Sequence, residues 1–156
     1  MNAARTETTF SDSAVKGVRL YQMRTIIDST RGNLTVGEFG GELPFVPRRF
    51  FLTYQIPERT TRGEHAHLKC EQFLVCVRGS CAVSVDDGLH RDEFILDRPM
   101  VGVYVPPMVW AAEHQHSWDS TLMVFASDPY DPADYISDYA EFTRLVRRAD
   151  APTTPA

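Results

Sequence analysis

The chain has 156 residues, a hydrophobic fraction of 43%, a charged fraction of 24% and a net charge of −5. That length is typical of one domain, and the composition is ordinary for a globular protein. An acidic chain without a basic run argues against a general nucleic-acid binder and against a membrane-surface binder. It does not argue against an anionic small ligand, since a few convergent arginines can bind a pyrophosphate.

The sequence carries no signal that directs it to a membrane or out of the cell. No apolar run approaches the roughly 18 residues of a membrane span, and residues 1–13 lack the apolar core of a signal peptide. The cysteines Cys70, Cys76 and Cys81 form no C-x-x-C pair and are expected to be small buried side chains in a reducing compartment. We therefore expect a cytoplasmic protein.

Along the chain, short β-like runs recur with turn signals between them. Residues 1–14 are rich in Thr, Ser and Ala and are predicted to be a disordered leader, followed by a single domain over 15–148 and a flexible tail over 149–156. Many short strands without alternating helices indicate an all-β sandwich or barrel, and a small jelly roll fits the number of strands. The predicted strands cover residues 18–23, 33–39, 49–56, 72–77, 81–85, 90–96, 102–105 and 121–126.

Two local patterns add detail to this prediction. Asp86-Asp87-Gly88 has the chemistry of a two-residue hairpin turn, because Asp-Gly tolerates positive φ. Asp131-Pro132 predicts the start of an amphipathic C-terminal helix, with a capping residue followed by proline at the first helical position. Its apolar face would consist of Tyr135, Ile136, Tyr139, Phe142 and Leu145 or Val146, with Arg144, Arg147 and Arg148 near its negative end.

The densest chemistry lies in residues 62–72. On an extended strand, residues two apart point to the same face, so His65, His67, Lys69 and Glu71 are expected to form one row. Two imidazoles, an ammonium and a carboxylate are costly to bury without partners. A ligand or a metal explains such a row; the alternative is that the histidines are hydrogen-bonded interior side chains.

The row also matches H-x-H-x-x-x-E, the first metal-binding motif of the cupin superfamily, with Gly79 near the expected closing glycine. The second cupin motif supplies a fourth ligand, a histidine, at the position where this chain has Ala111. His114 or His116 would need a shift to take its place. Three ligands without the fourth disfavour tight binding, so we expect neither a metal nor another cofactor.

A set of motifs in order along the chain resembles the dTDP-4-keto-6-deoxyglucose 3,4-ketoisomerases, sugar ketoisomerases of the cupin superfamily. The motifs span residues 28–142, nearly the whole predicted domain. They are Asp28-Ser29-Thr30-Arg31-Gly32-Asn33-Leu34, Pro44-Phe45 with Arg49, Arg62-Gly63-x-His65-Ala66-His67, Glu71-Gln72-Phe73-Leu74-Val75-Cys76-Val77-x-Gly79-Ser80-Cys81, Asp86-Asp87-Gly88, Leu96-Asp97-x-Pro99, Gly102-x-Tyr104-Val105-x-Pro107-x-Val109-Trp110, and Ala126-Ser127-Asp128-x-Tyr130-Asp131-x-x-Asp134-Tyr135-Ile136-x-x-Tyr139.

The resemblance implies a cupin jelly roll, a metal-free site and a homodimer, and it leaves open whether β-strands are exchanged between subunits. It also implies a substrate linked to thymidine diphosphate (dTDP), a 4-keto-6-deoxyhexose that becomes the 3-keto isomer. Such products usually feed an aminotransferase that makes 3-amino sugars.

The expected chemistry agrees with the residues. The C4 ketone acidifies the proton on C3, and histidine has the near-neutral pKa needed to remove it. We assign His65 as the main base and His67 as its partner in proton transfer. The expected substrate-binding residues are Arg31, Arg62 and Lys69 for pyrophosphate or sugar oxygens, Tyr54, and Trp110 as a wall of the sugar site or as a core residue.

Two positions depart from the family pattern. Phe51 stands where the family commonly has tyrosine, so a proton-relay role of that phenol would pass to Tyr54 or to water. Ala111 replaces a polar residue that is frequent in relatives. Both changes leave the C4 configuration of the product, galacto or gluco, open.

Three other functions stay open on the sequence alone. A cupin sugar-nucleotide epimerase would need a second base on the opposite face of the sugar, for which the sequence offers no clear candidate. A metal-dependent cupin oxygenase would need bound iron or nickel. A non-catalytic sugar-nucleotide binding module would bind the ligand without exchanging its ring protons.

Overall fold

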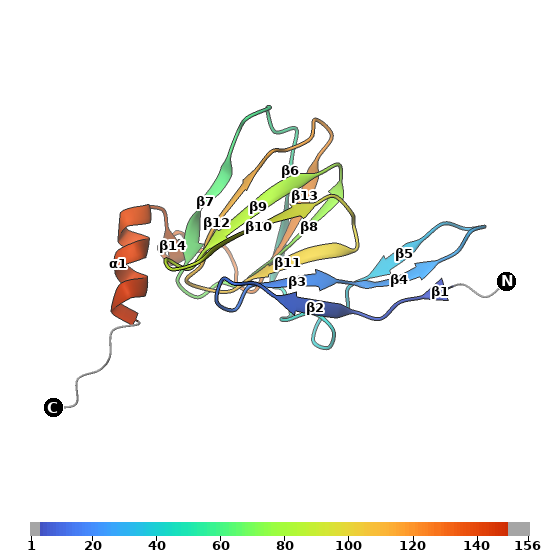
Figure 1. Ribbon diagram of the computed structural model, residues 1–156, viewed down its shortest axis with the longest axis horizontal. Coiled ribbons are helices and arrows are strands. Elements are labelled where there is room, and N and C mark those ends of the chain that lie inside the picture. Colours follow the sequence, from blue (N-terminus) through green and yellow to red (C-terminus); the bar gives the residue numbers. More distant parts are fainter. Residues whose placement is uncertain (1–3, 150–156) are drawn as a thin grey trace.

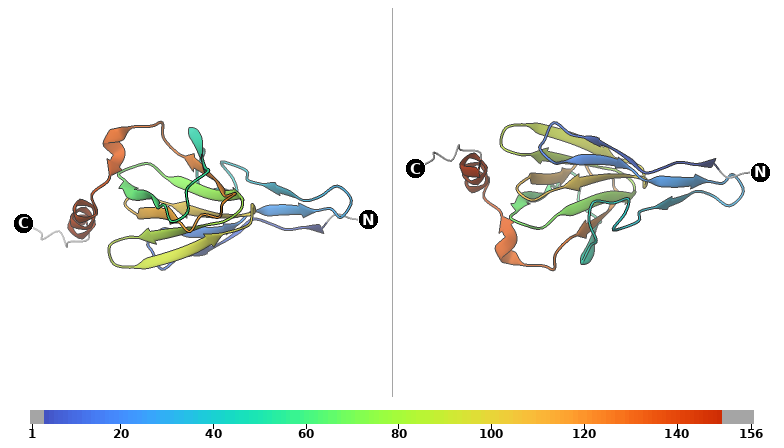
Figure 2. Two further views of the ribbon diagram at one scale, coloured as in Figure 1. Left: turned by 90° about the horizontal axis from the view of Figure 1, so that it is seen from above. Right: turned by 90° about the horizontal axis from the view of Figure 1, so that it is seen from below.

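Two antiparallel sheets face one another and enclose the core in the computed structural model, which describes residues 4–149 (Figures 1 and 2). The six-stranded sheet has the order β2 (Thr9–Asp12), β3 (Arg19–Gln22), β11 (Val101–Val105), β8 (Gln72–Arg78), β13 (Thr121–Ala126) and β6 (Arg49–Tyr54). The five-stranded sheet has the order β10 (Arg91–Leu96), β9 (Cys81–Asp86), β12 (Trp110–His114), β7 (Arg62–His67) and β14 (Tyr135–Ile136). The predicted all-β jelly roll with a C-terminal helix is confirmed.

A smaller sheet and one helix lie at opposite ends of this barrel (Figure 1). The small sheet has the order β1 (Ala4–Arg5), β4 (Arg24–Ile27) and β5 (Leu34–Val36) and projects away from the barrel. The helix α1 (Tyr139–Ala149) packs against the outer face of the five-stranded sheet, where Phe142 and Val146 join Ala66 and Ile136 in one apolar cluster. No helix among residues 4–149 is long and apolar enough to cross a membrane.

Alternation along each strand decides which side chains face the interior. Val83 and Val85 of β9 lie with Leu122 and Val124 of β13 in one buried cluster between the two large sheets. Residues one position away point outward. Ala111 of β12 belongs to the same inner cluster, so side chains directly opposite it on neighbouring strands also face the interior.

The C-terminal helix starts later than the sequence predicts. Asp131 does act as a cap, accepting a 3.0 Å hydrogen bond from the Ala133 amide, but it caps the short 3-10 helix η1 (Pro132–Asp134). The chain then pairs with β7 as strand β14 before α1 begins at Tyr139. The helical spacing of Tyr135 and Ile136 with later apolar residues was therefore misleading, because these two residues pair with β7 as a strand, which places Ile136 in the apolar cluster with Ala66.

The disordered leader predicted over residues 1–14 is wrong for residues 4–14. β1 and β2 pair with β4 and β3, and the Phe10 ring lies 5.3 Å from that of Tyr21. Polar residues suffice here because an edge strand gains its stability from backbone hydrogen bonds to its neighbour. Residues 1–3 of the predicted leader and residues 150–156 of the predicted tail lie outside the described part of the chain.

The hairpin predicted at Asp86-Asp87-Gly88 is confirmed, although its loop is longer than two residues. β9 and β10 pair from Asp86 and Arg91 onward, and residues 87–90 connect them. The Asp86 carboxylate accepts a 2.6 Å hydrogen bond from the Gly88 amide, and Gly88 has a φ of 88°, which favours glycine. The three cysteines are buried and unpaired, as expected.

Candidate active site

The predicted pair of histidines lies on β7, in the five-stranded sheet. His65 is directly opposite Ala111 of β12, and His67 is directly opposite Tyr135 of β14. Ala66 between them faces the helix α1 in the outer cluster, so both imidazoles point to the interior side of the sheet. The sequence period of two therefore predicted the orientation of this pair.

The two imidazoles are hydrogen-bonded to each other. Their Nε2 atoms are 3.2 Å apart, and the ring planes are nearly perpendicular at 84°. His67 is buried, whereas His65 is partly exposed. The pair thus has an inner member, His67, and an outer member, His65, that is open to a ligand.

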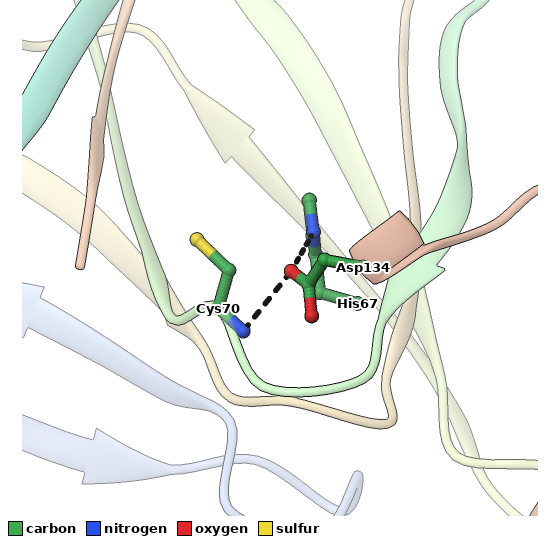
Figure 3. Close-up of side chains that lie close together, drawn as sticks. All are labelled: His67, Cys70 and Asp134. Atoms are coloured by element: carbon green, nitrogen blue, oxygen red, sulfur yellow. Dashed lines mark hydrogen bonds and ion pairs between the residues drawn. The ribbon is translucent and has the colours of Figure 1, made fainter. Parts of the chain in front are cut away.

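Asp134 completes a chain of three hydrogen-bonded groups, and Figure 3 shows its bond to His67. Its Oδ2 atom lies 2.9 Å from Nδ1 of His67, and Asp134 is itself 4% exposed. The carboxylate also accepts hydrogen bonds from the backbone amides of Lys69 at 2.8 Å and Cys70 at 3.2 Å. These contacts fix its orientation, so the carboxylate in turn fixes the ring of His67.

Burial and charge determine the protonation of this chain. Desolvation lowers the pKa of His67, and the Asp134 carboxylate only partly opposes that effect. A neutral His67 donates from Nδ1 to Asp134, so its Nε2 must accept from the Nε2–H of His65. In this tautomer the free lone pair of His65 is on Nδ1, which is available as a base.

Tyr135 packs against both histidines and was not predicted as a site residue. Its ring centroid is 4.8 Å from that of His65 and 4.5 Å from that of His67. Strand β14 brings Tyr135 to this place directly after η1 has positioned Asp134. Both residues occur in the last motif of the ordered set, which was the only sequence signal for them.

Arg49 supplies positive charge close to the pair. It lies on β6, with its guanidinium carbon 5.5 Å from the ring centroids of Phe51 and of Tyr130. Its charge contributes to the lowered pKa of His67. A partly buried arginine whose charge acts on His67 is suited to an anionic or oxygen-rich ligand.

Three of the predicted binding residues do not lie with the histidines within this chain. Arg31 sits in the connection between β4 and β5, 80% exposed and paired with Asp28 at 2.7 Å. Tyr54 lies on the outer face of β6 and is 60% exposed. Trp110 lies on the outer face of β12, where its ring packs against Tyr139 at 5.2 Å and Phe142 at 5.7 Å.

The predicted row ends at His67, where β7 ends. The amide of Leu68 donates to the Asp134 carbonyl and turns the chain, which leaves Lys69 exposed at 3.8 Å from Asp131. Glu71 accepts a 2.6 Å hydrogen bond from the Tyr104 hydroxyl instead of joining the imidazoles. Arg62, at the start of β7, stays exposed and opposite Glu113.

The residues present fit a metal poorly. Glu71 is held by Tyr104, and Ala111, which faces His65, offers no ligand atom. Ligand-type atoms of His67, Cys70 and Asp134 do lie within 4.8 Å of one another (Figure 3). The Asp134 carboxylate, however, already accepts hydrogen bonds from the imidazole and from two backbone amides, so the arrangement is suited to orienting a histidine.

Known proteins resemble the chain over most of its length. The family model described as FdtA, WxcM-like, C-terminal matches residues 16–147. A TDP-4-oxo-6-deoxy-alpha-D-glucose-3,4-oxoisomerase from Aneurinibacillus thermoaerophilus is 42% identical over 130 residues, which are 83% of this chain and 93% of that protein.

Two solved structures extend this comparison. A 3,4-ketoisomerase from Helicobacter canadensis is 34% identical with a TM-score of 0.80, covering 84% of this chain and 98% of the other. The second is a histidine-to-asparagine variant of a 3,4-ketoisomerase from Thermoanaerobacterium thermosaccharolyticum, solved in complex with TDP-4-keto-6-deoxyglucose. It is 28% identical with a TM-score of 0.83, and the match covers 88% of this chain and 99% of the other.

Proposed function

The chain belongs to the FdtA, WxcM-like family and is an isomerase, a sugar-nucleotide 3,4-ketoisomerase, and we propose that His65 is the base that starts its reaction. The enzyme converts a dTDP-4-keto-6-deoxyhexose into the dTDP-3-keto-6-deoxyhexose. A proton leaves C3, an enediol-type intermediate forms, and a proton returns to C4. The observation that carries our assignment of residues is the hydrogen-bonded series His65–His67–Asp134.

The series divides the work between the two histidines. His65 accepts the C3 proton and becomes an imidazolium, whose Nε2–H already points at Nε2 of His67. His67 can take up that positive charge because the Asp134 carboxylate stabilises a protonated partner at 2.9 Å. The carbon-derived proton is therefore held on the imidazole pair, where it can exchange with solvent at the partly exposed His65 before a proton is delivered to C4.

Three cations are suited to bind the diphosphate and the sugar oxygens. Arg49 is the one nearest the imidazoles, since its charge acts on His67. Arg62 at the start of β7 and Lys69 just after its end are exposed and free to contact phosphate oxygens. Guanidinium groups suit such oxygens because they can donate two parallel hydrogen bonds.

The reaction is tested by incubating the full chain with dTDP-4-keto-6-deoxyglucose and identifying the product by NMR. A 3-keto sugar nucleotide is expected, and its C4 configuration would be assigned in the same spectrum. An altered configuration at C3 or C5 with the ketone still at C4 would indicate an epimerase. Tight binding without any product would indicate a binding module.

A second copy of the chain is the partner that the outer surface favours. Phe50, Leu52 and Tyr54 of β6 and Val77 of β8 are 63%, 41%, 60% and 41% exposed on the outer face of the six-stranded sheet. Large apolar side chains exposed on one face of a sheet are typical of an interaction surface. The projecting β1–β4–β5 sheet (Figure 1) is the segment available for strand exchange, and it would carry Arg31 toward the partner.

The homodimer is tested with Phe50→Asp. Wild-type protein is expected to have twice the 17.7 kDa mass of the chain in multi-angle light scattering. The aspartate should shift the protein toward the monomer, because it places a charge in an apolar interface at a cost of a few kcal/mol. Leu89→Asp, at an exposed apolar residue of the β9–β10 loop, serves as the matched control. A monomeric wild-type protein would contradict the proposal.

We place the enzyme in the cytoplasm, where three unpaired cysteines would stay reduced. Its 3-keto product suits an aminotransferase, because a ketone is the acceptor of an amino group, and the enzyme then serves the synthesis of 3-amino deoxysugars.

A further inference from the structure

Another buried titratable side chain, Glu113, faces the interior of the barrel on the sheet that carries the histidines. It lies on β12 two residues after Ala111 and therefore shares its inward face. It is directly opposite Val83 of β9 and Arg62 of β7, and only 9% of its surface is exposed. Within residues 4–149, its carboxylate forms no ion pair and no hydrogen bond with the side chain of another residue, and only a backbone hydrogen bond within Glu113 itself contributes to its electrostatics.

The local backbone leaves room for this carboxylate. The β7–β12 pairing shifts by a bulge between Ala111 and Ala112, where Gly63 and Glu64 both have positive φ. A Cβ atom at Gly63 would lie 3.1 and 3.2 Å from the two carboxylate oxygens of Glu113 and 2.9 Å from the Ala111 carbonyl oxygen. Only glycine fits at this position without displacing the carboxylate.

Glu113 and His65 can therefore reach one bound sugar. His65 pairs with Ala111, and Glu113 lies two residues further along β12 on the same inner side, diagonally across the bulge from His65. The reacting atoms of the sugar are two adjacent carbons and their two oxygens. A base on one diagonal position and a carboxyl on the other can act on different atoms of that group.

The proton balance of the ketoisomerase reaction requires a second carrier. C3–H and O3–H are broken, while C4–H and O4–H are formed. The histidines handle the carbon-bound proton, and the hydroxyl proton must still move from O3 to O4. Phe51 has no hydroxyl group, and Tyr54 lies on the outer face, so neither can carry this proton.

On the basis of the proposed function, we infer that Glu113 is a further catalytic residue that carries the hydroxyl proton between the two sugar oxygens. As His65 removes the C3 proton, the C–H electron pair forms the C3=C4 bond, and O4 takes its proton from the Glu113 carboxyl group. In the second half, O3–H gives its proton to the Glu113 carboxylate, C3=O forms, and C4 takes a proton from the imidazolium. Glu113 ends protonated and the histidines neutral, as they began.

The electrostatics agree with this role. Burial raises the pKa of Glu113 to about 7, with the charge of Arg62 opposing the rise. Both protonation states are then accessible near neutral pH, as a group that alternately donates and accepts a proton requires.

The test compares two rates in Glu113→Gln, measured by NMR with dTDP-4-keto-6-deoxyglucose in deuterated water. Glutamine has the shape of glutamate and can donate a hydrogen bond to O4, but it cannot transfer the proton. The rate of 3-keto product formation is expected to fall by about 10²-fold or more, while the rate at which the C3 proton exchanges through His65 falls much less. The ratio of exchange to product should rise by at least about tenfold, with KM nearly unchanged.

Two further variants keep the inference falsifiable. Glu113→Asp retains the acid, so its exchange-to-product ratio should stay at the wild-type value even if both rates drop. Glu93→Gln, on the outer face where Glu93 contacts His114 at 3.1 Å, is the matched control and should behave as wild type. An unchanged ratio in Glu113→Gln would overturn the inference. Absence of both exchange and product in the wild-type protein would instead overturn the proposed function.

Discussion

Replacement of His65 by asparagine is expected to reduce both C3 proton exchange and product formation by at least about 10³-fold, near the upper range for loss of a general base. Asparagine keeps a hydrogen-bonding group beside Nε2 of His67, but it cannot accept a proton from carbon. The side chain of His65 is partly exposed and, within residues 4–149, forms no hydrogen bond other than the one to His67, so the fold should be retained. The measurements are the rate of C3 exchange by NMR and kcat for the product, with far-UV circular dichroism as the folding check.

The control for this variant is His90→Asn. His90 lies in the β9–β10 connection with 60% of its side chain exposed, and it should be replaceable without effect on either rate. His67→Asn should slow the reaction less than His65→Asn or alter its course, because His67 stores the proton and does not meet the carbon. A His65→Asn protein with wild-type exchange would rule out His65 as the base.

The second large effect is expected for Asp134→Asn, with kcat reduced by about 10²–10³-fold, by analogy with other aspartates that orient a catalytic histidine. The amide no longer stabilises a positive charge on His67 and allows the ring to take the wrong tautomer. The same change weakens the bonds from the Lys69 and Cys70 amides, so the free energy of unfolding should fall by about 2 kcal/mol.

Steady-state kinetics and urea unfolding measure these two effects separately. Asp131→Asn is the matched control, because this neighbouring carboxylate caps η1 and asparagine is an equally good cap. It should leave kcat within about threefold of wild type. If Asp134→Asn lost stability but kept wild-type kcat, Asp134 would have only a structural role.

The ordered motifs predicted the family, the jelly roll and the ketoisomerase reaction, and these predictions are confirmed. The paired imidazoles could be placed on one face because the period of a strand is two and both residues lie within one strand, β7. The extension of that row to Lys69 and Glu71 was wrong. The chain turns at Leu68, whose amide bonds to a carbonyl that is distant in sequence.

The unpredicted residues depend on contacts that no local pattern reveals. Asp134 is 67 residues from His67, and a short 3-10 helix and a two-residue strand place it there. The spacing of apolar residues predicted one continuous helix from Asp131 onward. The pairing of Tyr135 and Ile136 with β7 prevents that helix. The positions of Trp110 and Tyr54 depend on which of two faces each strand turns inward, and alternation alone does not decide between them.

The central claim is that the imidazoles accept a carbon-bound proton without the help of a bound metal ion. The most direct test uses wild-type protein dialysed against a strong chelator and mixed with dTDP-4-keto-6-deoxyglucose in deuterated water. We expect the C3 proton signal to disappear and the 3-keto product to appear at the rate of untreated enzyme. The account would be contradicted if the chelated enzyme neither exchanged the C3 proton nor formed the 3-keto product, and if adding a divalent metal restored both activities.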